Sequence, residues 1–121
     1  MNCLFCQIIK GEKESLTIYE DEIVKVFLDA YPDNNGHTLI IPKKHYTNIV
    51  DIDEETLNHI MKISKKIYSL LTDKLQPDGI KLIQNNGLPQ VIKHYHLHLI
   101  PVYKNQNKLM NIKDVYNIIV N

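Results

Sequence analysis

The chain has 121 residues, of which 44% are hydrophobic and 23% are charged, as in an ordinary globular domain. Its 14 basic and 14 acidic residues cancel, which argues against binding to nucleic acid or to a membrane surface, because both depend on a positive field. All the basic residues are lysines, so any bound anion is held without the bidentate guanidinium group of arginine. We expect a single domain over residues 1–121, with a core at about 3–104 and a partly helical tail at 105–121.

The first strands are predicted to form a β-hairpin. Two β-rich runs, 16–20 and 23–29, flank Asp21 and Glu22. A loop with proline and glycine follows, and the next β-rich run, 37–42, is stopped by a proline. We therefore expect three strands before the first long helix.

The middle of the chain has the periodicity of an amphipathic helix. Asp51 or Asp53 is a suitable cap for its start, and the sequence PDG at 77–79 ends it. His59 falls on the polar face and is predicted to be exposed to solvent. The positions that recur at spacings of three and four, and so define the packed face, are Leu57, Ile60, Met61, Ser64, Ile67, Leu71 and Leu75.

The C-terminal part is predicted to add two strands and a terminal helix. The runs 79–86 and 94–103 are rich in β-forming residues, and 110–120 is predicted to be helical. Together these elements indicate an α+β fold, with a mainly antiparallel five-stranded sheet, one long helix and short terminal helices.

Three histidines alternate with apolar residues in HYHLHLIP, residues 94–101. In a strand, alternate side chains share one face, so His94, His96 and His98 are predicted to point the same way, while Tyr95 and the two leucines point into the core. Such a row is typical either of a metal site or of nucleophilic and acid–base chemistry, because imidazole titrates near neutral pH.

Two cysteines open the chain as Cys3-x-x-Cys6 and are the only ones in it. We expect no signal peptide and a cytoplasmic protein, in which these residues are thiols or metal ligands rather than a disulfide. The pair is compatible with a redox motif or with half of a zinc site. For the second possibility, His45 and His94 are the available imidazoles.

The histidine row, taken with four other segments, resembles the histidine triad (HIT) family of nucleotide hydrolases and transferases, in its zinc-containing bacterial-type branch. The segments follow the family's order at about its separations, so the resemblance extends over nearly the whole chain. They are CLFCQIIKGE (3–12), YEDEIVKVFLD (19–29), GHTLIIPKKH (36–45) and IQNNG followed by HYHLHLIP (83–101).

The resemblance implies a division of work among the histidines. His96 would be the nucleophile that attacks the α-phosphorus and becomes a nucleotidyl-histidine. His98 would stabilise the developing charge on the phosphate, and His37 would support the triad. The residues that the resemblance assigns to nucleotide binding are Phe5, Ile8 and Phe27 around the base, Asp29 at the ribose, and Asn85 and Gln90 near the ribose and phosphate.

The resemblance also implies a structural zinc ion and a homodimer. Its ligands would be Cys3, Cys6, His45 and His94, which would tie the N-terminal segment to the catalytic strand. On this basis we expect a phosphoramidase or dinucleoside polyphosphate hydrolase that acts on purine nucleotides.

Two alternatives stay open. The loop before the triad is about two residues shorter than is usual in the family, and it carries Pro89, which has no N–H, and Val91, which has no hydroxyl. These changes suggest a nucleotide-binding or interaction protein with little turnover. The other alternative is a catalytic metal held by His94, His96 and His98 together.

Overall fold

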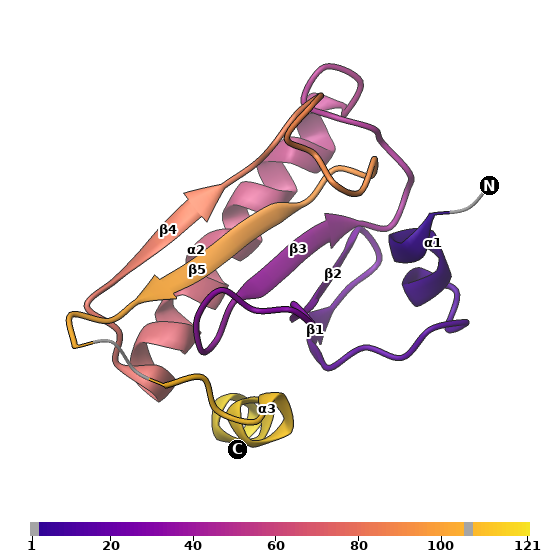
Figure 1. Cartoon of the computed structure of the whole chain (residues 1–121). Helices are drawn as coiled ribbons and strands as arrows, with labels where there is room; N and C mark the ends of the chain where they lie inside the picture. The colour runs from indigo at the N-terminus through magenta and orange to yellow at the C-terminus, as the bar shows by residue number, and fades with distance from the viewer. Residues whose placement is uncertain (1–2, 106–107) are drawn as a thin grey trace.

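The computed structural model describes residues 3–105 and 108–121 and shows one antiparallel sheet with helices on both of its faces (Figure 1). The strand order is β1-β2-β3-β5-β4, and all neighbouring strands are antiparallel. The elements are α1 (Leu4–Ile9), β1 (Thr17–Glu20), β2 (Val24–Leu28), β3 (Thr38–Pro42), α2 (Glu54–Leu75), β4 (Gly79–Ile83), β5 (Leu97–Val102) and α3 (Ile112–Val120). The expected α+β class with five strands is confirmed.

The last strand starts later than its sequence pattern predicts. β5 begins at Leu97, so His94 and His96 precede it. The reason lies in the backbone hydrogen bonds, because the Tyr95 N–H donates to the Tyr46 carbonyl oxygen (2.6 Å) in a loop rather than to a neighbouring strand. Tyr95 is nevertheless buried, as expected. β4 likewise ends at Ile83, three residues earlier than predicted.

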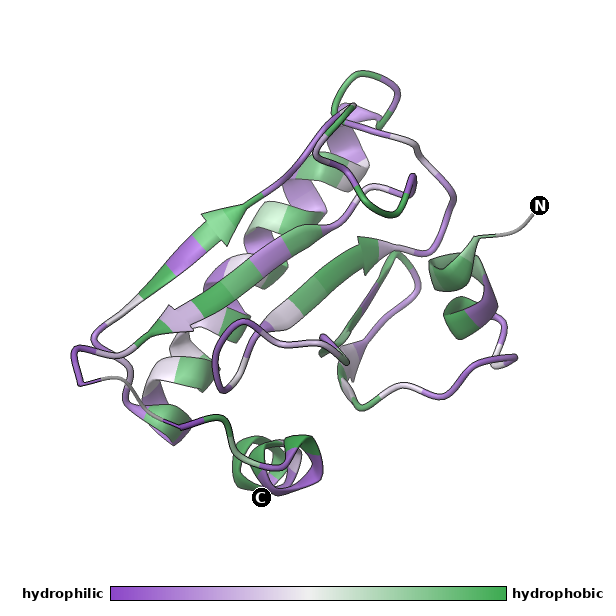
Figure 2. Cartoon of the chain, in the orientation of Figure 1, coloured by the Kyte–Doolittle hydropathy of each residue, from purple (hydrophilic) through white to green (hydrophobic). Residues whose placement is uncertain are grey.

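Alternation along β2 and β3 separates two apolar layers. Val26 and Ile40 face α2 and α3, within the larger core. Phe27, Leu39 and Ile41 face the other side and pack in a smaller cluster with α1. In Figure 2 the strands are largely green, whereas α2 carries both green and purple residues, as expected for a helix with one buried face. No helix in the described parts of the chain combines the length and apolar character needed to span a membrane.

The long helix begins after Asp53 and ends at Gln76, which adopts a left-handed conformation. Its buried residues are Ile60, Ile63, Ser64, Ile67 and Leu71. Met61, which the periodicity placed on the packed face, is 45% exposed. Ile63 takes that place because it lies three and four residues from the other two buried isoleucines, Ile60 and Ile67.

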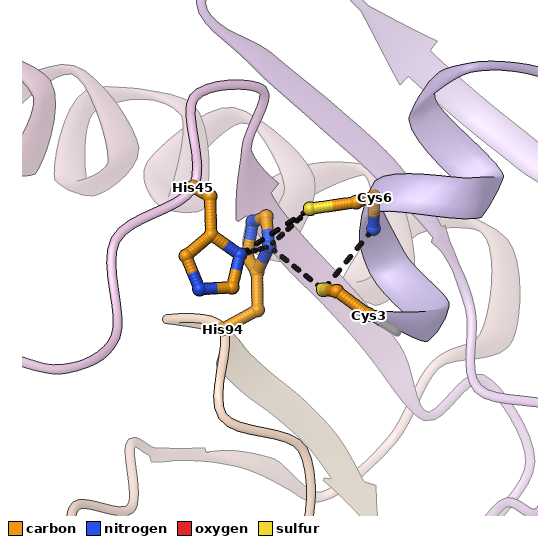
Figure 3. A group of neighbouring side chains, drawn as sticks. All are labelled: Cys3, Cys6, His45 and His94. Carbon is orange, nitrogen blue, oxygen red and sulfur yellow. Dashed lines mark hydrogen bonds between the residues drawn. The ribbon is translucent and has the colours of Figure 1, made fainter. Parts of the chain in front are cut away.

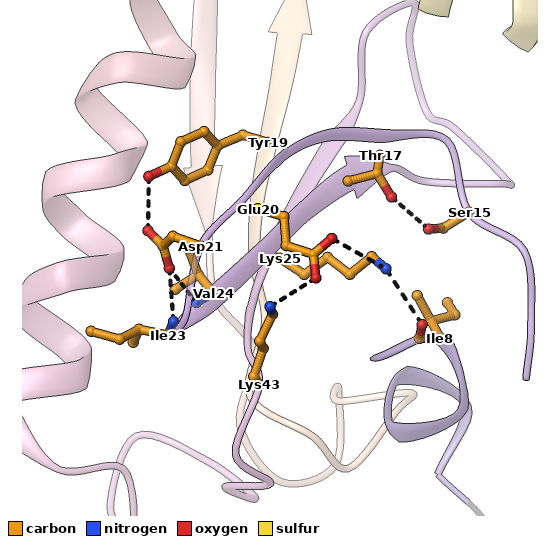
Figure 4. Close-up of polar contacts among 10 residues, drawn as sticks. All are labelled: Ile8, Ser15, Thr17, Tyr19, Glu20, Asp21, Ile23, Val24, Lys25 and Lys43. Carbon is orange, nitrogen blue, oxygen red and sulfur yellow. Dashed lines mark hydrogen bonds and ion pairs between the residues drawn. The ribbon is translucent and has the colours of Figure 1, made fainter. Parts of the chain in front are cut away.

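The prediction for His59 is wrong. Its side chain is only 23% exposed, and Nε2 lies 2.7 Å from Oδ2 of Asp21. The Asp21 carboxylate also accepts hydrogen bonds from the Tyr19 hydroxyl and from the Ile23 and Val24 N–H groups (Figure 4). His59 therefore joins α2 to the turn between β1 and β2, a long-range contact that helical periodicity does not reveal.

Gly36 precedes β3 with φ +91°. A Cβ atom here would overlap Leu75 Cδ1 and lie 3.2 Å from Pro101 Cγ. We expect Gly36→Ala to lower the free energy of unfolding by about 2–4 kcal/mol, because backbone strain and overpacking add. Gly11→Ala is the matched control, with φ +81° and no atom within 4 Å of the added Cβ. Urea denaturation measures both, and equal losses would contradict a packing role for Gly36.

Candidate functional site

A cavity of about 690 Å³ opens on the α1 side of the sheet. This volume is in the range of small-molecule sites. Apolar residues of α1 and β2 contribute to its lining, and His96 and His98 line it as well. The cavity therefore brings an apolar surface next to two imidazoles.

His96 is held as one tautomer. Its Nδ1 atom lies 2.7 Å from the carbonyl oxygen of His94. Because a carbonyl oxygen only accepts, Nδ1 carries the hydrogen, and Nε2 keeps a free lone pair. The Phe5 ring packs edge-on against the imidazole at 5.0 Å between centroids, which further fixes the ring. The ring of His96 is thus held with an unshared electron pair on Nε2.

A hydrogen-bonded chain orients His98. The Asp33 N–H donates to His37 Nδ1 (3.0 Å), so the proton of His37 lies on Nε2. That Nε2 is 2.9 Å from His98 Nδ1 and donates to it, which leaves His98 with its own proton on Nε2. Asp29 Oδ2 lies 3.5 Å from His37 Nε2. The rings of His96 and His98 are 4.8 Å apart, so a lone pair and an N–H donor stand side by side.

Burial keeps this group of imidazoles neutral. It lowers the pKa values of His37 and His96, and together with the neighbouring His96 and His37 it lowers the pKa of His98 to about 4. A neutral His96 retains the lone pair that a nucleophile needs.

The lowered pKa of His98 predicts a pH-dependent stability. Between about pH 6.5 and 4 the unfolded chain binds a proton at this residue and the folded chain does not, so the free energy of unfolding falls as the pH falls. We expect His98→Gln to lose less stability than the wild type between pH 7.5 and 5, as measured by urea denaturation. An identical pH dependence in both proteins would contradict this prediction.

The structure brings most of the predicted nucleotide-binding residues together. Phe5, Ile8, Phe27, Asp29 and Asn85 all line the cavity.

Gln90 does not line the cavity. It is 3% exposed, and its Nε2 donates to the Thr47 carbonyl oxygen (2.6 Å), so its side chain points into the protein. Val91 and Pro89 line the cavity instead. Ile112 and Lys113 of α3 also reach it, and no local sequence signal indicates this, because it follows from how the C-terminal segment packs.

Cys3, Cys6, His45 and His94 form a second group (Figure 3). Sulfur–nitrogen distances are 3.4 Å for Cys3–His94 and 3.3 Å for Cys6–His45, and the two Nδ1 atoms are 3.1 Å apart. Zinc–ligand bonds of about 2.0–2.3 Å in a tetrahedron place ligand atoms about 3.3–3.8 Å apart. The four donor atoms are therefore arranged closely enough to hold one such ion.

The protonation of this second group also suits a metal. His94 Nε2 lies 2.8 Å from the Pro42 carbonyl oxygen, so it carries the proton and leaves the Nδ1 lone pair facing the other donors. Burial and the neighbouring Cys3 raise the pKa of Cys6 to about 11. A divalent cation at the centre would reverse that effect by stabilising thiolates.

His94 faces the cysteines, whereas His96 and His98 face the cavity. The three therefore do not converge on one ion. A further group consists of Asp29, His37 and His98, with one donor atom of each residue within 4.8 Å of the others. Its two imidazole nitrogens, His37 Nε2 and His98 Nδ1, are already hydrogen-bonded to each other.

Comparison with known proteins shows which family the chain is similar to. The model of the HIT domain matches residues 10–105. A HIT-like protein of Methanocaldococcus jannaschii is 40% identical over 118 residues, covering 96% of this chain and 91% of the relative. The adenosine 5'-monophosphoramidase of Schizosaccharomyces pombe is 34% identical over 103 residues, covering 84% of this chain and 74% of the enzyme. The crystal structure of a zinc-bound histidine triad family protein from Mycobacterium smegmatis superimposes with a TM-score of 0.89 at 31% identity, covering 99% of this chain and 91% of that one.

Proposed function

The chain belongs to the HIT family, and from this premise we propose that it is a nucleotide hydrolase or nucleotidyl transferase that acts through His96. Its substrates are purine nucleoside phosphoramidates or dinucleoside polyphosphates, and it acts at their α-phosphate. The observation that carries the proposal is the His96 tautomer, with its Nδ1 hydrogen bonded to the His94 carbonyl oxygen and its Nε2 lone pair facing the cavity.

In the first step, the lone pair of His96 Nε2 forms a bond to the α-phosphorus. The bond from phosphorus to the leaving group breaks, and the amine or the nucleoside polyphosphate leaves with the bonding electrons, the amine taking a proton from solvent water. The imidazole gains positive charge, which the His94 carbonyl oxygen stabilises through Nδ1–H. Water, or another acceptor, then displaces His96 and releases the nucleotide.

His98 assists by donating from Nε2 to a phosphoryl oxygen. Because His37 fixes its tautomer, this N–H is in place before the reaction and need not reorient. A neutral donor of this kind takes the role that arginine has in many phosphoryl-transfer enzymes, and the chain contains no arginine.

The cavity also has apolar and polar groups suited to binding a nucleoside. Phe5, Ile8 and Phe27 provide apolar surface for a purine ring, and the rings of Phe5 and Phe27 meet edge to face at 5.7 Å. The Asp29 carboxylate accepts hydrogen bonds from the ribose hydroxyls. The side chain of Asn85 supplies further polar contacts.

We assign a structural zinc ion to Cys3, Cys6, His45 and His94. These residues would hold the ion with two sulfur and two Nδ1 donors, and the ion would supply cross-linking rather than chemistry. Because His94 also provides the carbonyl oxygen that holds His96, the site stiffens the catalytic segment.

We propose a homodimer, for which the exposed Leu82 on edge strand β4 and Tyr68 on α2 offer apolar surface. The free cysteines suit a reducing, cytoplasmic compartment.

The test is release of AMP from adenosine phosphoramidate and from a diadenosine polyphosphate, followed by chromatography. We expect release from at least one of them. If AMP binds but neither substrate is cleaved, the chain is instead a nucleotide-binding protein with little turnover, an alternative that Pro89 and Val91 in the cavity wall favour.

A further inference from the structure

The helix α3 contributes to the cavity although it lies outside the residues that match the HIT domain. Ile112 and Lys113, in its first turn, line the cavity. Ile112 also lines a small neighbouring cavity together with Leu28 and Asp29. The first turn of α3 is therefore next to the end of β2, where Asp29 faces the nucleotide site.

The position of α3 is fixed by packing and by hydrogen bonds. Val115 and Ile119 are 2% and 1% exposed and belong to the main core. The Tyr116 hydroxyl donates to the Thr17 carbonyl oxygen (2.9 Å), and Asn111 caps the helix by accepting from the Lys113 N–H (2.9 Å). The backbone of Lys113 is consequently held at the cavity.

Lys113 is the only lysine that lines this cavity in the described parts of the chain, and the chain has no arginine. Two carboxylates, those of Glu14 and Asp29, also line it. Lys113 is exposed, and in the described residues no carboxylate oxygen lies within 4.0 Å of its ammonium group. Without a cation, the two carboxylates would repel a nucleotide phosphate.

We propose that Lys113 is a nucleotide-binding residue whose ammonium group attracts the anionic phosphate of a nucleotide in the cavity. This inference rests on the proposed function. Because the lysine is exposed, screening limits the interaction, and we expect about a three- to tenfold contribution to affinity at low ionic strength. The contribution shrinks in high salt.

The test is calorimetric titration of AMP and of adenosine into the wild type, Lys113→Gln and Lys113→Arg. Lys113→Gln is expected to lower the affinity for AMP about three- to tenfold in low salt and to leave the affinity for adenosine unchanged. Salt should also reduce the AMP affinity of this variant less than it reduces that of the wild type. Lys113→Arg is expected to retain the affinity for AMP. Lys65→Gln is the matched control, because it removes an exposed charge from α2, away from the cavity.

The outcomes distinguish a failure of the Lys113 assignment from a failure of the proposed nucleotide function. If Lys113→Gln binds AMP as tightly as the wild type, or weakens AMP and adenosine equally, the assignment of Lys113 is overturned and the proposed function stands. An equal effect of Lys65→Gln would also overturn it, because net charge alone would explain the result. If the wild type binds neither compound, the proposed nucleotide function fails as well.

Discussion

His96→Ala is expected to abolish the covalent nucleotidyl adduct and to lower kcat/KM by about three orders of magnitude or more, because the proposed nucleophile is removed. The adduct is measured by intact mass after rapid quenching with adenosine phosphoramidate. His96 lies at the cavity with its Nε2 lone pair free, and no second imidazole among residues 3–105 and 108–121 has the same arrangement. The neighbouring His98 directs an N–H, not a lone pair, to that side.

Two further variants make the result specific. His98→Gln is expected to form the adduct more slowly but still form it, since only charge stabilisation is lost. His59→Ala is expected to keep the adduct while it loses stability, because His59 contacts Asp21 and neither residue lines the cavity. An adduct in His96→Ala would show that another residue is the nucleophile.

The local patterns of the sequence predicted the fold well because the elements alternate clearly. β2 and β3 are short, mostly apolar runs that are buried along most of their length, and the helical spacing of α2 determines which of its faces is buried. The predictions are wrong where a contact between distant parts of the chain determines the structure. One example is the hydrogen bond from the Tyr95 N–H to the Tyr46 carbonyl oxygen, because of which β5 begins later than predicted. His59 is a similar case, because its partner Asp21 lies 38 positions away.

The sequence predicted those candidate site residues that lie in the segments resembling the family. His96, His98 and Asp29 line one cavity, and the donor atoms of Cys3, Cys6, His45 and His94 lie within 4.8 Å of one another. The orientation of Gln90 was not predictable, because its amide bonds to a carbonyl 43 positions away. The entry of Lys113 into the cavity was not predictable either, because it depends on the packing of α3.

Cys3→Ser is expected to remove zinc from the protein and to lower Tm by about 10 °C. A tightly bound ion stabilises the folded state by about 3–4 kcal/mol when free zinc is 100–1,000 times its Kd, and for a domain of this size that corresponds to roughly this shift. The variant is informative because Cys3 also caps α1, with Sγ accepting from the Cys6 N–H at 3.3 Å. Serine preserves a cap, so the loss is assigned to the metal.

Metal analysis and thermal unfolding, with and without a chelator, measure the effect. The chelator should lower the Tm of the wild type to nearly that of Cys3→Ser and should leave the variant almost unchanged. His96→Ala should keep its zinc, since His96 binds the backbone of His94 and not the group of donors. Zinc retained in Cys3→Ser but lost in His96→Ala would instead place the metal at the catalytic histidines, and the division of the three histidines between structure and chemistry would be wrong.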